Sequence, residues 1–285
     1  SALRGDRRWT APDARTHYEE LRDQGVVGVV VPSGDREGQV VLRNAEHITQ
    51  PFALPVLQVA SKDARALTAA LVLGGVEGRL EVDGERLKSR ASNVVATVQG
   101  SDPDARPLAV MTPKSGWFTC AAERGGGIAI LLALAEALAR ETPARTVHFL
   151  ASSGHELHHL GLEAYLHERP TLAQDAAAWL HLGASIGARF PAARMGASDD
   201  ALHGLARDAL VAAGCEAEAM EAGSPGGGEA RAIAERGGRY VTFLGGHRYL
   251  HSPSDTVDLA VDAASVSRWG QAAWAVLQGM LALDD

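Results

Sequence analysis

The feature that most restricts the fold of this chain is the alternation of apolar runs and helical patterns after about residue 90. The stretch IAILLALAEALARE (128–141) has helical spacing, and RTVHFLAS (145–152) directly after it reads as a buried strand. Strand and helix patterns go on alternating as far as a final long helix over 260–283. This order predicts an α/β fold: a three-layer α/β/α sandwich around a mostly parallel, mixed sheet.

The first ninety residues carry a separate pattern of short elements, which predicts a small α/β unit. A new pattern of strand, proline-containing turn and strand begins near residue 90, so we expect domains over 1–90 and 91–285. The expected elements of the first domain are a helix over 13–25, strands over 26–31 and 54–60, a helix over 61–75, and a strand with a turn over 76–87.

Bulk composition excludes several classes of protein. Hydrophobic residues make up 46% and charged residues 22%, as in ordinary soluble domains, and the net charge of −8 argues against a nucleic-acid partner. No apolar run is long enough to span a membrane, and the first residues lack the apolar core of a signal peptide. The two cysteines are far apart and form no C-x-x-C pair. We therefore expect a cytoplasmic protein. No pattern in the sequence indicates its oligomeric state.

The chain contains a literal H-E-x-x-H string at His155, Glu156 and His159. In zinc metalloproteases with this motif both histidines lie within one helix and face the same metal ion. Here Gly154 directly follows a predicted strand, so His155 and Glu156 fall at the start of a helix. We therefore interpret the string as something other than a zincin helix, and we expect His158, His159 and His167 to be surface or packing residues.

Three motifs, in this order, resemble the M28 family of zinc aminopeptidases. They are ERGGGIAILLALAEAL (123–138), GHELHHLGLEAYL (154–166) and LHSPSDTVD (250–258). The resemblance extends from about residue 90 to the end, and LPVLQVASKDARALTAAL (54–71) is similar to the end of a protease-associated (PA) domain. It implies a zinc-aminopeptidase-like fold preceded by a PA-like domain.

The resemblance also implies an altered metal site. Family members bind two zinc ions that share a bridging Asp, and a Glu beside a ligand Glu is the general base. The bridging position falls on Glu123, the base on His155, the ligand Glu on Glu156 and the last ligand on His251. These positions leave one zinc with three candidate ligands, Glu123, Glu156 and His251, as in the family's mononuclear branch, which includes glutaminyl cyclases.

The ligands of the second ion have no counterpart. The family's first His falls in Met111-Thr112-Pro113-Lys114, and its later strand Asp falls in LHLGASIG (180–187). The absence of any metal is therefore the close alternative, with Lys114 supplying positive charge in its place. A two-zinc aminopeptidase is the interpretation that we reject.

Several residues near the expected strand ends are candidates for catalysis or substrate binding. His155 is a candidate base, because its ordinary pKa of about 6.5 suits proton transfer near neutral pH. Cys120 is either a nucleophile activated by His155 or a structural thiol, and Glu123 with Arg124 is either part of a metal site or an ion pair at a helix start. The candidate catalytic residues are His155, Glu156, Lys114 and Glu123, and the candidate substrate-binding residues are Trp117, Cys120, Arg124, His181 and Glu229.

Three functions remain open on these observations. The first is a hydrolase or acyltransferase that acts on an amide or peptide-type small substrate with one zinc ion. The second is a metal-free enzyme that uses Lys114, His155 and Glu123. The third is a catalytically inactive relative that binds a ligand or a protein in the old cleft.

Overall fold

The structure, a computed structural model, describes residues 12–33, 38–42, 52–85 and 87–283. Contacts divide the chain into two compact units. The first comprises Ser1–Arg90 with His251–Pro253, and the second comprises Ala91–Leu250 with Ser254–Asp285.

The first unit consists of two short parallel strands and two helices. Val29 pairs with Val56 in the register of the two strands, and Tyr18 is fully buried against apolar neighbours that include both of these valines. The strand predicted over 76–87 is wrong, because the described part of that stretch has no regular structure and Val82 is 66% exposed. The elements are α1 (Pro12–Asp23), β1 (Val29–Pro32), β2 (Val56–Val59) and α2 (Ser61–Leu73).

The second unit is built on a seven-stranded mixed sheet in the order β3-β5-β4-β6-β9-β7-β8. The four central strands, β5, β4, β6 and β9, run parallel. Strand β3 pairs antiparallel with β5, β7 pairs antiparallel with β9, and β8 pairs parallel with β7. The strands are β3 (Val94–Val98), β4 (Leu108–Pro113), β5 (Val147–Ser152), β6 (Ala178–Leu182), β7 (Pro191–Ala197), β8 (Glu218–Ala219) and β9 (Tyr240–His247).

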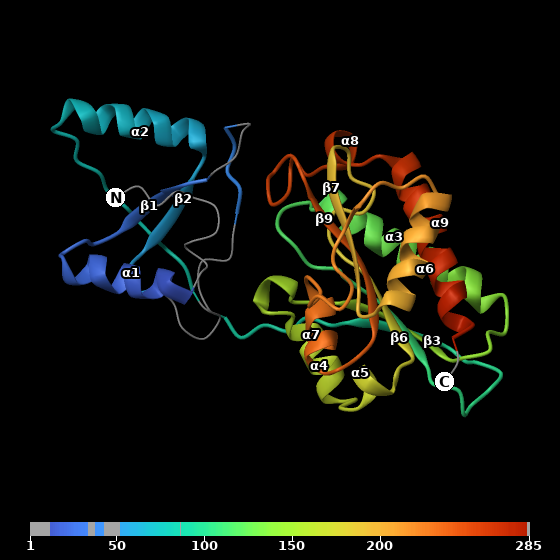
Figure 1. Cartoon of the computed structure of the whole chain (residues 1–285). Helices are drawn as coiled ribbons and strands as arrows, with labels where there is room; N and C mark the ends of the chain where they lie inside the picture. The colour runs from blue at the N-terminus through green and yellow to red at the C-terminus, as the bar shows by residue number, and fades with distance from the viewer. Residues whose placement is uncertain (1–11, 34–37, 43–51, 86, 284–285) are drawn as a thin grey trace. The chain divides into compact units, whose positions relative to one another are not determined.

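Helices cover both faces of this sheet, as Figure 1 shows. Side chains of α3, α6 and α9 join one buried apolar cluster, and side chains of α4, α5 and α7 join the cluster on the opposite face. The predicted three-layer α/β/α architecture with a mostly parallel sheet is confirmed. The helices are α3 (Ala121–Ala139), α4 (Leu160–His167), α5 (Leu172–Asp175), α6 (Asp200–Ala212), α7 (Glu229–Glu235), α8 (Val257–Ala260) and α9 (Ala263–Leu281), with a 3-10 turn, η2, at His155–Leu157.

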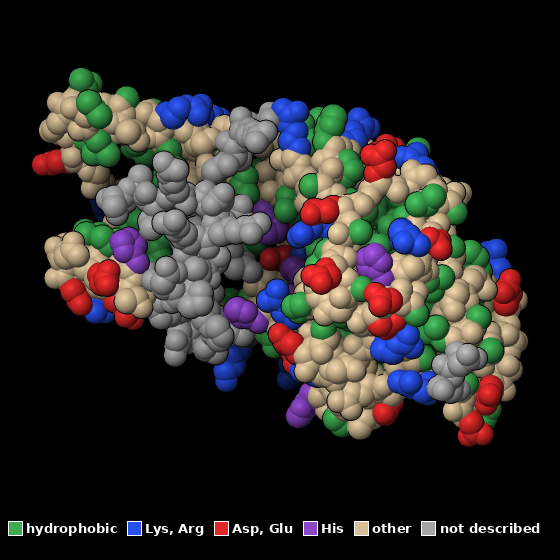
Figure 2. All heavy atoms as spheres, viewed as in Figure 1, with side chains coloured by type: hydrophobic (Ala, Val, Ile, Leu, Met, Phe, Trp, Pro, Cys, Tyr) green, Lys and Arg blue, Asp and Glu red, His purple; other side chains and the backbone are tan. Residues whose placement is uncertain are grey.

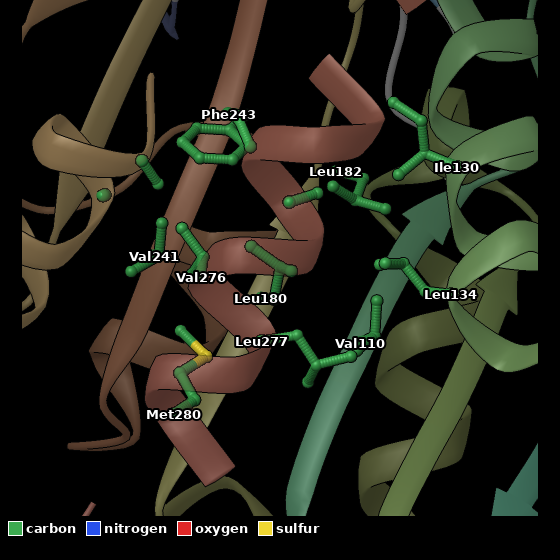
Figure 3. Packing of buried hydrophobic residues seen from close by; sticks show 14 of the residues in the cluster. Val110, Ile130, Leu134, Leu180, Leu182, Val241, Phe243, Val276, Leu277 and Met280 are labelled. Atoms are coloured by element: carbon green, nitrogen blue, oxygen red, sulfur yellow. The ribbon is translucent and has the colours of Figure 1, made fainter. Parts of the chain in front are cut away.

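The larger core cluster lies between the sheet and helices α3, α6 and α9. Side chains from β4, β6 and β9 meet those of α3 and α9 there, and Figure 3 shows Val110, Leu180 and Leu277 among them. Helix α3 also approaches the loop after β6 very closely, since a Cβ atom at Gly126 would lie 1.8 Å from the carbonyl oxygen of Ile186. This contact fixes the start of α3 at the edge of the sheet where strands β4, β5 and β6 end.

One face of the second unit carries charged side chains of both signs. Acidic and basic side chains are interspersed over the face of the second unit in Figure 2, without a broad area of one charge. Of the helices that the described residues form, none is both long enough and apolar enough to cross a bilayer.

Candidate functional site

The candidate site lies where the parallel strands of the second unit end. Lys114 directly follows β4 and His155 lies three residues beyond the end of β5, while His181 belongs to β6. In open parallel sheets the carboxyl ends of the strands are where ligands bind. The described residues there form two polar clusters, each centred on one buried charged side chain.

The first cluster is centred on the guanidinium of Arg124, in the first turn of α3. Its Nη2 atom lies 2.8 Å from Glu123 Oε1 and 2.8 Å from Glu156 Oε1. Its Nε atom donates to the carbonyl oxygen of Ser115 at 2.8 Å. Arg124 and Glu123 are almost completely buried, at 2% and 1% exposure. The ion pair that the sequence offered as one interpretation of Glu123 and Arg124 is therefore formed, and Glu156 shares the same cation.

Backbone hydrogen bonds fix the start of α3 beneath this cluster. The carboxylate of Asp255 accepts from the amide of Ala122 at 2.7 Å and from that of Glu123 at 3.1 Å. The carbonyl oxygen of Glu123 accepts from the amide of Ser185 at 3.0 Å. Asp255 thus satisfies two N–H groups that the first turn of a helix leaves without a partner.

The second cluster is centred on the carboxylate of Glu229, the first residue of α7, whose side chain is 1% exposed. His155 Nδ1 lies 2.8 Å from Glu229 Oε1, and His181 Nε2 lies 3.3 Å from Glu229 Oε2. His181 is held from behind, because its Nδ1 atom lies 2.8 Å from the hydroxyl oxygen of Thr242. The backbone amide of His155 donates to Ser115 Oγ at 3.1 Å. Three predicted site residues, His155, His181 and Glu229, are thereby brought together.

Glu229 is held as a carboxylate in this cluster. Burial alone would raise its pKa, but the hydrogen bond from His155 and the neighbouring imidazole of His181 hold the pKa well below its ordinary value. An ionised carboxylate only accepts hydrogen bonds, so His155 donates its Nδ1–H to Glu229.

His159 also belongs to this cluster, contrary to the expectation that it would be a surface or packing residue on a helix. The H-E-x-x-H string is no continuous helix: η2 ends at Leu157, and His158 and His159 both have left-handed backbone angles, with φ of 57° and 59°. The ring of His159 lies 4.9 Å from that of His155, centroid to centroid. Burial lowers the pKa of His159, which favours its neutral form. The only hint of its position in the sequence was the spacing of the string itself.

Two of the remaining predicted residues are half-buried after β4 and belong to neither cluster. Lys114 donates its backbone N–H to the carbonyl oxygen of Ser152 at 2.8 Å and has no ion pair among the described residues. Trp117 has a buried Nε1 atom that finds no acceptor in the described part of the chain. Their assignment to catalysis or substrate binding stays a prediction.

Cys120 occupies the N-cap position of α3 with a left-handed φ of 40°. Burial, followed by the charge of Glu123, raises the pKa of its thiol. A raised pKa leaves less of the reactive thiolate at neutral pH, which favours a structural role over a nucleophilic one.

His251 groups with the first unit, where its Nδ1 atom lies 2.9 Å from the carbonyl oxygen of Leu42. The set of Glu123, Glu156 and His251 as ligands of a single zinc ion stays a prediction.

Gly183 directly follows β6 and lies within the stretch 180–187 in which the resemblance puts the family's later strand Asp. A Cβ atom at Gly183 would come within 2.9 Å of Cε1 of His181 and within 2.9 Å of Cβ of Leu244. The buried imidazole of His181 therefore occupies space that a side chain at position 183 would need.

Comparison with known proteins agrees with this architecture. The sequence profile of Peptidase family M28 matches residues 93–277, and a comparison with curated proteins finds no match. A zinc aminopeptidase from Bacillus subtilis has a TM-score of 0.70 at 15% identity, covering 97% of this chain and 68% of that one. A Peptidase M28 precursor from Shewanella amazonensis gives 0.72 at 21% identity, with 92% and 61% covered. An aminopeptidase from Aneurinibacillus sp. strain AM-1 gives 0.64 at 15% identity, with 92% and 64% covered.

At these identities the structural neighbours show a common fold, and the chain spans only 61% to 68% of their length. The profile match is the more specific finding, because it covers well over half of the sequence and nearly all of the second unit. The chain belongs to peptidase family M28.

Proposed function

We propose that this chain hydrolyses peptide or related amide bonds at the cluster of His155 and Glu229. The observation that carries the proposal is the 2.8 Å contact between His155 Nδ1 and Glu229 Oε1. A buried carboxylate that orients an imidazole is a common arrangement for proton transfer in enzymes. Membership of a peptidase family supports a peptide or amide as the substrate class.

The geometry of the pair explains how it would contribute to hydrolysis. Glu229 is 1% exposed while the side chain of His155 is 21% exposed, so the imidazole lies between the buried charge and the solvent. The hydrogen bond to Glu229 orients the imidazole and leaves its second ring nitrogen, Nε2, outside the pair. This nitrogen is the atom with which the site would activate water for attack on the substrate carbonyl. The same attack on a carbonyl would serve an acyl transfer if an amine took the place of water.

The two zinc ions that the family implies do not fit these residues. The guanidinium of Arg124 already lies between the carboxylates of Glu123 and Glu156, at 2.8 Å from each. No carboxylate lies in the stretch 180–187 where the resemblance puts the later strand Asp, and a Cβ atom at Gly183 would already come within 2.9 Å of Cε1 of His181. We therefore assign no step of the proposed reaction to a two-zinc centre.

The test is turnover of a panel of amino-acid p-nitroanilides and short peptides, with free and with blocked amino termini. We expect His155→Ala and Glu229→Gln to lower kcat/KM by about 100-fold or more, because each removes one half of the pair. His167→Ala is the matched control, since His167 is an exposed histidine at the end of α4. Adding an amine acceptor distinguishes hydrolysis from acyl transfer.

Two results would contradict the proposal. If the folded wild-type protein turns over none of these substrates, a ligand-binding or protein-binding role is the better explanation. If turnover survives Glu229→Gln but is lost with His155→Ala, Lys114→Ala and Glu123→Gln, the chemistry belongs to the metal-free alternative that uses those three residues.

A further inference from the structure

The cluster around Glu229 combines side chains that are typical of transition-metal sites. One ligand atom each from His155, His159 and Glu229 lies within 4.8 Å of the other two. His155 and His159 are partly buried and Glu229 is buried, so this is no accidental group of exposed acids. None of the three falls on a ligand position that the resemblance assigns, because those positions fall on Glu123, Glu156 and His251, and His155 falls on the position of the base.

One carboxylate oxygen of Glu229 has no hydrogen-bond partner among the described residues. Oε2 of Glu229 and Nε2 of His181 are both buried, and neither finds a hydrogen-bond partner among the described residues, although they lie 3.3 Å apart. Buried polar atoms of this kind are rare because their desolvation is costly, and each calls for an explanation. A cation bound at the carboxylate would compensate for the desolvation of its charge.

The backbone supports the same grouping. His159 reaches His155 only because the chain leaves η2 through two successive left-handed residues, His158 and His159. Residues other than glycine seldom adopt this conformation, which costs free energy and tends to persist at functional sites. The Glu156 carboxylate between the two histidines points to Arg124 instead, so it does not compete for the cluster.

We propose that His155, His159 and Glu229 bind one divalent ion of the zinc class, with His181 supporting the carboxylate from the buried side. Two imidazoles and one carboxylate are a common ligand set of catalytic zinc, and they leave a position open for water. Calcium and magnesium are disfavoured because they prefer oxygen ligands. Because one ring nitrogen of His155 cannot both ligate the ion and accept a proton, the bound ion would activate water in place of His155. This catalytic role rests on the proposed function, whereas binding of the ion does not.

The test uses the full chain, stripped with a chelator and then titrated with zinc chloride, with elemental analysis and calorimetry as readouts. We expect about one zinc per chain, and at least a tenfold weaker affinity in His159→Ala and in Glu229→Gln. His159→Ala is the more informative variant because the side chain is only partly buried, so its circular dichroism should match that of the wild type. His167→Ala, which removes an exposed histidine eight residues further along, should bind zinc as the wild type does.

Other results would overturn the proposal. If the wild type binds no zinc in the micromolar range, the cluster is a metal-free hydrogen-bonded group. If zinc binding survives His159→Ala and Glu229→Gln but is lost with Glu156→Gln, the ion belongs to the other predicted ligand set. Zinc bound without turnover of any peptide substrate would uphold the metal site and contradict the proposed function. Turnover by protein that binds no zinc would uphold the proposed function and contradict the metal site.

Discussion

The guanidinium of Arg124 lies 2.8 Å from the carboxylate of Glu156, a residue that is 32 positions away in the sequence and belongs to another element. The same Nη2 atom contacts Glu123, so one buried cation neutralises two carboxylates. Glu123, on which the resemblance puts the bridging metal ligand, thus forms an ion pair with a cation of the protein itself, Arg124.

Replacing this cation should therefore be costly. We expect Arg124→Met to lower the free energy of unfolding by about 3–5 kcal/mol, because it removes the charge that the buried carboxylate of Glu123 and the partly buried one of Glu156 share. The double variant Arg124→Met, Glu156→Gln should lose less than the sum of the two single variants. Urea unfolding of the four proteins measures the coupling, and a cost below about 1 kcal/mol for Arg124→Met would mean that the ion pairs are not formed.

Neighbouring glycines at the start of α3 should respond to alanine in opposite directions. A Cβ atom at Gly126 would lie 1.8 Å from the carbonyl oxygen of Ile186, whereas a Cβ atom at Gly125 meets no heavy atom within 4 Å. We expect Gly125→Ala to stabilise the protein by about 0.5–1 kcal/mol, because alanine is the better helix former. Gly126→Ala should destabilise it by more than this, because backbone has to move. Thermal unfolding of the two variants compares them directly, and equal effects would contradict the close contact.

Asp255 should be required for the first turn of α3. Asp255→Ala removes the acceptor of two backbone N–H groups, those of Ala122 and Glu123. We expect a loss of about 1–3 kcal/mol in the free energy of unfolding, with a smaller loss for Asp255→Asn, which retains one acceptor oxygen. The amides of these two residues should also exchange with deuterium faster in Asp255→Ala. If these two amides remained equally protected from exchange in Asp255→Ala, Asp255 would not stabilise the first turn of α3.

The stability of the second unit should depend on pH through Asp199, the N-cap of α6. Burial would raise the pKa of Asp199, but hydrogen bonds from Arg239, Leu202 and Ser198 lower it below its ordinary value. A carboxyl group with a lowered folded-state pKa stabilises the protein above its unfolded-state pKa of about 3.9, and this contribution is lost as the pH falls through the folded-state pKa. Because the group is partly exposed, we expect Asp199→Asn to cost at most about 1 kcal/mol at pH 7. The difference from the wild type should shrink below about pH 4 in urea unfolding, and a constant difference down to pH 2 would contradict the assignment.

The elements with strong local patterns were predictable from the sequence. Helix α3 and strand β5 agree with expectation, because their apolar spacing depends only on neighbouring residues. Strand β7 was missed because PAARMGA contains no β-branched or aromatic residue, and its extended form comes from antiparallel pairing with β9. The opposite error concerns residues 76–87: their sequence has a strand-like pattern, but the described part of this stretch forms no strand and has no described strand beside it.

The candidate site was predictable in its residues but not in its grouping. His155, His181 and Glu229 were all singled out, yet their contact joins positions up to 74 residues apart, which no local pattern reports. His159 was misplaced because the sequence suggests a continuous helix there, while the backbone takes two left-handed residues before α4 begins. The ion pair of Glu123 with Arg124 was one of two interpretations of the sequence, whereas the contact of Arg124 with Glu156 was not expected.

The contact between His155 and Glu229 has a thermodynamic consequence. It joins the loop after β5 to the first residue of α7, so the cluster can exist only when most of the second unit is folded. Anything that binds there and not to the unfolded chain must therefore raise the unfolding temperature, by an amount that grows with its concentration relative to its dissociation constant. Heating the protein in the presence of candidate ions or peptide analogues thus becomes a screen that requires no knowledge of the reaction.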